Sequence, residues 1–282
     1  MNAARIASLH VYPVKGARAL DVAEAGIAIE GLSTQGLGDR EWMVVDAANR
    51  FISQRSHARL ALVGVAVDRR ALVLSIPGQA AVAIPLDAPQ VGARDVVVWH
   101  SEVRGFDEGD AAANALSAFL GEPLRLMRFD ARTPRLCNPD FAGDSGAHTR
   151  YADGYPLLVI GAQSLRDLND RLAARGERAL PMNRFRPNLV IEGVDAFDED
   201  HIDTLTVAGV VLKVVKPCIR CEVTTIDQST AIAGDEPLLT LSSYRLHVTP
   251  LPGIAFGVNA IVQSGAGATL AVGDEVNAEF AF

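Results

Sequence analysis

The sequence predicts an α+β protein that consists mostly of β-strands and contains a few helices. Short β-branched runs recur through the first half of the chain, two segments carry an apolar stripe with helical spacing, and strand patterns resume after Pro187. Strands that are this short and this frequent are typical of a barrel or a sandwich.

The first half contains most of the predicted strands. They cover residues 6–14, 41–45, 51–53, 60–67, 71–76 and 96–99. Asp46–Asn49 and Asp68–Arg70 separate neighbouring runs with turn-forming or charged residues, which indicates two hairpins.

Two helices follow from start and stop signals. Asp110 is placed to cap a run that Gly121 ends, and Ser164 is placed to cap a second run that Gly176 ends. The second run carries an apolar stripe of Leu165, Leu168 and Leu172. Residues 130–155 are polar and rich in glycine and proline, so we expect a long loop there. The later strands cover residues 189–191, 205–207 and 210–215.

Composition excludes several classes of protein. The formal net charge is −8 over 282 residues, which argues against nucleic acid as a partner. No apolar run approaches the length of a membrane helix, and the N-terminus does not resemble a signal peptide. Three cysteines make no disulfide framework, so we expect free thiols and a cytoplasmic location.

The sharpest motif is a pair of cysteines, Cys218 and Cys221, after a strongly predicted strand. Pro217 restricts its own backbone and that of Lys216, which puts the pair where the strand ends. Lys216 and Arg220 make the local field positive, and this favours thiolate over thiol. A thiolate at a strand end is a suitable ligand for a soft metal ion.

The motif alone leaves three other interpretations open. Structural zinc needs four ligands, yet Cys137 is distant in sequence and no histidines show ligand spacing. A thioredoxin-like dithiol would open a helix, and Thr224–Thr225 does not look like a helix start. Two buried, inert cysteines are the third possibility.

Basic residues beside proline, glycine or asparagine form the second feature. Lys15, Arg40 and Arg186 each stand next to a predicted strand. If they converge, they make a phosphate clamp, in which arginine contributes a bidentate fork. Taken singly, each is better explained as a solvated surface charge or a cap of a loop carbonyl. Asp153 could hydrogen-bond a heterocycle or move a proton, or serve as an ordinary turn residue.

Together these segments resemble a known family. Residues 12–16 and 38–42 resemble the MOSC N-terminal β-barrel domain, and residues 185–190 and 218–225 resemble the MOSC domain. Their order is similar to that of the mitochondrial amidoxime-reducing component and of bacterial reductases of N-hydroxylated bases. The resemblance implies a MOSC N-terminal domain at 1–125, packed on a MOSC β-barrel at 126–282, with the site between them.

The resemblance also implies a molybdenum cofactor, Mo-molybdopterin, with Cys221 as the metal ligand. It implies that the remaining cofactor contacts come from Lys15, Gly16, Arg40, Asp153, Tyr155, Arg186, Asn188, Ile219, Arg220 and Asn259. Gly16 stands where the family often has serine, and Tyr155 stands where relatives carry a small hydroxyl residue.

The implied reaction is reduction of a small N-hydroxylated molecule, with Cys221 and Asp153 as the catalytic residues and protons from solvent or Asp153. Electrons would come from a separate donor protein: a ferredoxin-like protein, a flavin reductase or a b-type cytochrome. The alternative is a molybdenum cofactor carrier or a sulfur-transfer module, with persulfide chemistry at Cys221 or Cys218. Pyridoxal phosphate is associated with the family only through a partner domain, for which we find no room.

Overall fold

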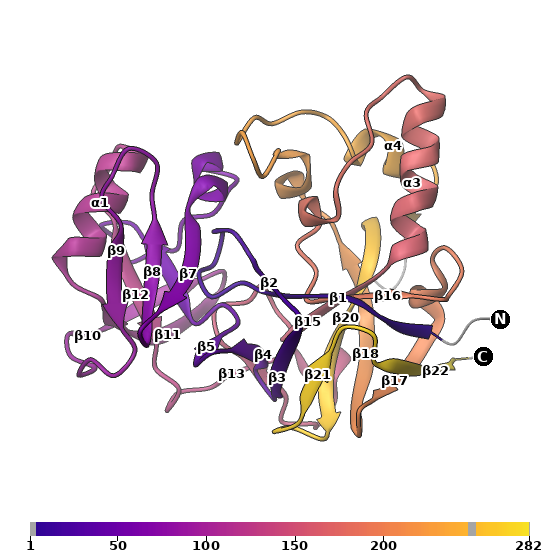
Figure 1. Cartoon of the computed structure of the whole chain (residues 1–282), viewed down its shortest axis with the longest axis horizontal. Helices are drawn as coiled ribbons and strands as arrows, with labels where there is room; N and C mark the ends of the chain where they lie inside the picture. The colour runs from indigo at the N-terminus through magenta and orange to yellow at the C-terminus, as the bar shows by residue number, and fades with distance from the viewer. Residues whose placement is uncertain (1–3, 248–251, 282) are drawn as a thin grey trace.

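The computed structural model describes residues 4–247 and 252–281. It has two lobes, one built from the indigo-to-magenta part of the chain and one mainly from the orange and yellow part (Figure 1). Strands dominate both lobes and only a few helices are present, which confirms the predicted α+β, mostly β class.

The second lobe is a closed barrel. Its strands, in order around the barrel, are β15 (Leu157–Gly161), β16 (Leu189–Glu192), β1 (Ala4–Val11), β22 (Glu275–Phe280), β17 (Ile202–Val207), β18 (Val210–Ile219) and β20 (Gly253–Ser264). Pairing of β20 with β15 closes the circle, and only the pair of β15 and β16 is parallel. Alternating apolar residues fill the interior, as expected when a sheet closes on itself. The first strand of the chain is therefore part of the barrel that the C-terminal half builds.

Short strands extend this sheet and connect it to the first lobe. β2 (Leu20–Val22) pairs with β1, and β19 (Leu246–His247) pairs with β20. A separate sheet contains β21 (Thr269–Ala271), β3 (Glu24–Ala28), β4 (Gly31–Thr34) and β5 (Leu37–Gly38). The two halves of the chain are thus interleaved.

The first lobe contains two more sheets and a helix. One sheet has the order β10 (Ala93–Val98), β11 (Ser101–Asp107), β12 (Arg125–Phe129) and β6 (Trp42–Val45), and the other has β7 (Gly64–Asp68), β8 (Ala71–Ser75) and β9 (Val82–Pro85). Helix α1 (Asp110–Leu120) packs its buried face on them. β12 begins at Arg125, so the predicted domain boundary between residues 125 and 126 falls within this strand. The boundary itself stays a prediction.

The other helices and short strands lie mainly around the barrel. They are η1 (Ala58–Leu62), β13 (Arg135–Leu136), α2 (Pro139–Ala142), β14 (His148–Thr149), α3 (Ala162–Ala174), η2 (Met182–Arg184), η3 (Asp198–His201), η4 (Glu222–Thr225) and α4 (Leu238–Ser242). Of these, η denotes a 3₁₀ helix, and η1 belongs to the first lobe. Among the described residues, no helix combines the length and apolar character needed to cross a membrane.

Several local predictions were wrong in detail. Residues 60–62 belong to η1 rather than to a strand, and residues 51–53 contribute only a bridge between Val45 and Phe51. Asp110 is the first helical residue and makes no side-chain cap. Ser164 lies inside α3, where its hydroxyl bonds the buried Glu199 instead of capping the helix. Thr224–Thr225 does form a helical turn, η4, although a short one.

Candidate active site

A cleft between the lobes contains every residue that the sequence singled out for the site. It is lined by Lys15, Gly16, Arg40, Asp153, Tyr155, Arg186, Asn188, Ile219, Arg220, Cys221 and Asn259. These residues come from loops and strand ends in both halves of the chain, so the fold, rather than sequence proximity, brings them together. Their individual roles stay predictions.

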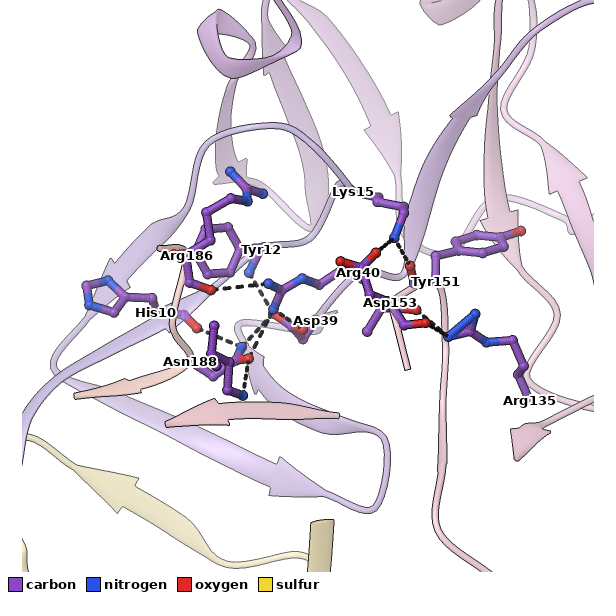
Figure 2. Close-up of polar contacts among 12 residues, drawn as sticks. His10, Tyr12, Lys15, Asp39, Arg40, Arg135, Tyr151, Asp153, Arg186 and Asn188 are labelled. Carbon is purple, nitrogen blue, oxygen red and sulfur yellow. Dashed lines mark hydrogen bonds and ion pairs between the residues drawn. The ribbon is translucent and has the colours of Figure 1, made fainter. Parts of the chain in front are cut away.

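Lys15 and Asp153 form an ion pair at one wall of the cleft (Figure 2). The Lys15 Nζ donates to Asp153 Oδ1 at 2.5 Å and to the Tyr151 carbonyl at 2.8 Å. Trp99 Nε1 donates to the same carboxylate oxygen at 3.1 Å. A backbone bridge between Val14 and Trp42 holds the segment that carries the lysine. The pair therefore joins the N-terminal segment to the loop before β15.

Burial and the ionic partner together set the pKa values of Lys15 and Asp153. Burial lowers the pKa of Lys15, and Asp153 partly offsets that effect. Surrounding protein atoms oppose ionisation of Asp153, but the Lys15 ammonium and the Trp99 indole outweigh them and hold the pKa of Asp153 well below its usual range. At neutral pH, Asp153 is therefore a carboxylate that faces the cleft with 77% of its side chain exposed.

Arg40 and Arg186 pack on the ring of Tyr12, which brings two guanidinium groups together. Their Cζ atoms lie 4.3 Å and 4.4 Å from the ring centroid. Both arginines have positive φ, +45° and +57°, which is uncommon for residues other than glycine. Arg40 pairs with the buried Asp39 at 2.5 Å, whereas Arg186 has no carboxylate within ion-pair distance among residues 4–247 and 252–281. Burial lowers the pKa of Arg186 to about 10, so it remains a cation at neutral pH.

The buried Tyr12 side chain adds an unsatisfied group to this arrangement. Its hydroxyl has no hydrogen-bond partner in the described part of the chain, and burial raises its pKa to about 12. A buried polar group without a partner costs stability, so such groups are often completed by a ligand or water.

The side chain of Asn188 holds Arg40 in position at the cleft through a hydrogen bond. Its side-chain oxygen accepts from Arg40 Nη1 at 3.1 Å and from the Leu158 amide at 3.2 Å. Its side-chain nitrogen donates to Asp39 at 3.0 Å and to the His10 carbonyl at 3.2 Å (Figure 2). With both amide atoms occupied and a side chain that is almost fully buried, Asn188 orients the arginine.

The two cysteines of the pair differ in position and in partners. Cys218 lies within β18, and its sulfur accepts a hydrogen bond from Arg220 Nη1 at 3.0 Å. Cys221 follows β18 directly at the start of η4, and its thiol neither caps that turn nor bonds another described residue. Cys137 lies in a separate apolar cluster, where burial raises the pKa of its thiol to about 11. Cys221 is therefore the cleft sulfur that is free to bind a ligand.

The two positions that depart from the family pattern have structural explanations. Gly16 has φ of +85°, and a Cβ there would lie 3.2 Å from Leu60 Cδ1, so the turn suits glycine. Tyr155 is buried and its ring packs in the apolar cluster of Cys137. Asn259 lies half-buried on β20, paired in register with Lys216 and Leu158.

Several cleft residues were not identified from sequence. They are Phe51, Ser53, Gln54, Arg55, Trp99 and Thr224 among the lining side chains. Arg55 packs on Trp99 at 4.6 Å, and Gln54 bonds both Gln228 and the Gly16 carbonyl. The only available signal was the short polar run 53–55 at the end of a predicted strand, which resembles an ordinary turn.

The cleft thus combines the thiol of Cys221, which has no hydrogen-bond partner among the described residues, with a set of three cations and with oriented polar groups such as Asn188. The three cations, called the cationic clamp below, are Lys15, Arg40 and Arg186. This donor set fits an anionic ligand that carries a soft metal. It does not fit structural zinc, because no group of three histidine, cysteine, aspartate or glutamate side chains gathers in the part of the chain that the structure describes.

Comparison with known proteins identifies two domains and a set of relatives. Residues 3–123 match the MOSC N-terminal beta barrel domain, and residues 147–277 match the MOSC domain. The chain is 33% identical to human mitochondrial amidoxime reducing component 2, over 96% of this chain and 82% of that protein. It is 35% identical to human mitochondrial amidoxime-reducing component 1, over 85% of this chain and 72% of that protein.

A crystal structure of the YuaD protein from Bacillus subtilis aligns over 97% of this chain and 94% of that chain, at 12% identity and a TM-score of 0.43, which is too distant to inform the site. The two domain matches and the identity to the human relatives are sufficient to assign the chain to a family. The chain belongs to the family of MOSC-domain proteins that includes the mitochondrial amidoxime-reducing components.

Proposed function

We propose that the chain binds a molybdenum cofactor, Mo-molybdopterin, in the cleft and reduces small N-hydroxylated molecules. One observation carries the proposal: the free thiol of Cys221 lies in the same cleft as the cations Lys15, Arg40 and Arg186. Relatives named for amidoxime reduction, at 33% and 35% identity, support the same reaction class.

The residues present fit such a group. A thiolate at Cys221 would bind the metal, and the cationic clamp would bind the anionic parts of the cofactor. The charge of Arg186, which lines the cleft without a carboxylate partner among the described residues, is a group that an anion would satisfy. Asn188 would keep Arg40 in position, and the backbone at Ile219 and Arg220 would line the cofactor.

Reduction of an N–OH group to N–H and water consumes two electrons and two protons. When bound, the cofactor would supply the two electrons. Asp153 is a carboxylate at neutral pH, so it would pass on a proton from solvent or from Lys15 rather than hold one in reserve. A separate electron-donor protein completes the proposal: a ferredoxin-like protein, a flavin reductase or a b-type cytochrome.

Elemental analysis tests the proposal most directly. Protein expressed in a host that makes the pterin cofactor should contain close to one molybdenum per chain, and protein from a host that cannot make it should contain none. The loaded protein should reduce benzamidoxime with a chemically reduced viologen as donor. Loaded protein that lacks this turnover would favour the alternative, a cofactor carrier or sulfur-transfer module. Our expectation of a cytoplasmic location stays a prediction.

A further inference from the structure

A groove on the outer side of the cleft is formed by both lobes. The N-terminal lobe contributes Gln54, Arg55 and Ala58, where η1 begins. The barrel lobe contributes η4, the loop after it and α4, through Glu222, Thr225, Ile226, Ala233, Gly234, Asp235, Leu238 and Leu239. In Figure 1, the orange loop before α4 extends toward the N-terminal lobe.

The groove borders the cleft. Gln54 and Arg55 line both, and Glu222 of the groove directly follows Cys221 of the cleft. Arg55 and Glu222 face each other at the junction, with 4.0 Å between Nε and Oε1 and with both side chains partly exposed. Such a long, exposed ion pair contributes little stability, so a bound molecule can displace it at small cost.

Apolar side chains make up most of the groove wall. Leu239 is 51% exposed although it is a large hydrophobic residue, and the other apolar lining residues are Ala58, Ile226, Ala233 and Leu238. The loop that carries Ala233 is held in place, because Ile226 pairs with Ala233 and the Gly234 amide donates to the Thr225 carbonyl at 3.1 Å. The groove is therefore an ordered surface that lacks an apolar partner.

We propose that this groove binds the apolar substituent of the substrate while the N-hydroxylated group lies at Cys221. This inference rests on the proposed function and narrows the substrate class to N-hydroxylated molecules that carry an extended, uncharged hydrocarbon group. Arg55 and Glu222 compensate each other, so the junction favours neither charge on that group. Binding at the boundary of two lobes, with an apolar wall beside a polar centre, is typical of small-molecule sites.

Straight-chain amidoximes of two, six and ten carbons test the inference, with reduced viologen as donor so that no partner protein is needed. For the molybdenum-loaded wild type, kcat/KM should rise about twofold to fourfold per added methylene until the groove is filled, because a buried methylene gains roughly that factor. Leu239→Glu should abolish this increment. The exposed Ile232, which does not line the groove, provides the control, and Ile232→Glu should keep the increment.

The outcomes separate the two proposals. Equal increments in wild type and Leu239→Glu would overturn the groove assignment, and so would loss of the increment in Ile232→Glu. If the affinity of the physiological donor falls in Leu239→Glu while the increment persists, the groove is part of a protein docking surface instead. If even the two-carbon amidoxime is not reduced, the proposed function fails. Calorimetric dissociation constants of the same amidoximes for wild type, Leu239→Glu and Ile232→Glu then test whether the groove binds the hydrocarbon chain. Ala233→Phe, which puts a larger side chain into the groove lining, should end the increment at a shorter chain.

Discussion

The guanidinium group of Arg220 lies 3.0 Å from the sulfur of Cys218, so the two cysteines of the pair have different surroundings. Cys218 is held within β18 by this contact. Cys221, three residues on, has no hydrogen-bond partner for its sulfur in the described part of the chain. The geometry thus distinguishes a positioned cysteine from a free one, which the sequence motif alone does not.

Substitution of the two cysteines should separate these roles. In Cys221→Ala, bound molybdenum and amidoxime reduction should fall at least tenfold, because the substitution removes the proposed protein ligand of the metal. Cys218→Ala should keep more than half of the metal, since it removes only a neighbour of Arg220. Elemental analysis of both variants, purified in parallel, is the measurement. Full metal content in Cys221→Ala would show that the ligand has been assigned wrongly.

Removal of the carboxylate beside Lys15 should lower stability. In Asp153→Asn, the buried lysine keeps its charge but loses its ionic partner. The free energy of unfolding should fall by about 1 kcal/mol; this is well below the cost of breaking a fully buried pair, because Asp153 faces solvent. Urea unfolding at pH 7 measures the difference. An unchanged midpoint would mean that solvent screens the pair completely.

The lowered pKa of Asp153 should also make the free energy of unfolding depend on pH. The pKa of Asp153 is lower in the folded protein than in the unfolded chain, so its contribution to stability is fully present above the unfolded value, about 4. The contribution is lost as pH falls through the folded value. The advantage of wild type over Asp153→Asn should therefore begin to shrink below about pH 4, and unfolding curves of both proteins measured from pH 7 to pH 3 should show a difference that narrows toward pH 3. A constant difference would place the stabilising effect elsewhere.

Asn188 should matter for the cofactor through Arg40. In Asn188→Ala, Arg40, Asp39 and the Leu158 amide each lose a partner, which should cost about 2 to 3 kcal/mol of stability and reduce cofactor retention. Asn169 offers a matched control, because its side chain also makes two backbone hydrogen bonds, both to Leu180, but far from the cleft. Asn169→Ala should lose stability and retain molybdenum. Equal molybdenum loss in both variants would mean that reduced stability alone explains it.

The sequence predicted the fold class because strand, turn and helix-stop signals are local, and the residues that the family resemblance implied for the site all line one cleft. A strand end next to proline or glycine marks Lys15, Arg186 and the cysteine pair, and helix stops such as Gly121 depend on one residue. Ser164 shows the limit of such signals. It resembles a cap, yet Glu199, thirty-five positions away, takes its hydroxyl and also accepts from the Gly161 amide.

Long-range pairing explains what the sequence could not predict. Trp99 is an unremarkable strand residue until the fold places its indole on Asp153 and beneath Arg55. Gln54 and Gln228 lie 174 positions apart and exchange side-chain hydrogen bonds of 2.9 Å. Neither contact has a periodicity or turn signal, because each depends on how the two lobes meet.

Gly257 should be among the least replaceable glycines near the cleft. It has φ of +74°, and a Cβ there would lie 2.6 Å from Ile160 Cγ1 and 2.8 Å from the Val159 carbonyl oxygen, so Gly257→Ala adds backbone strain and a clash with β15. We expect a loss of about 3 kcal/mol. Gly273 has φ of +95° with no neighbour within 4 Å, so Gly273→Ala should lose only about 1 kcal/mol. Urea unfolding compares the two, and equal losses would mean that β15 yields to the added methyl group.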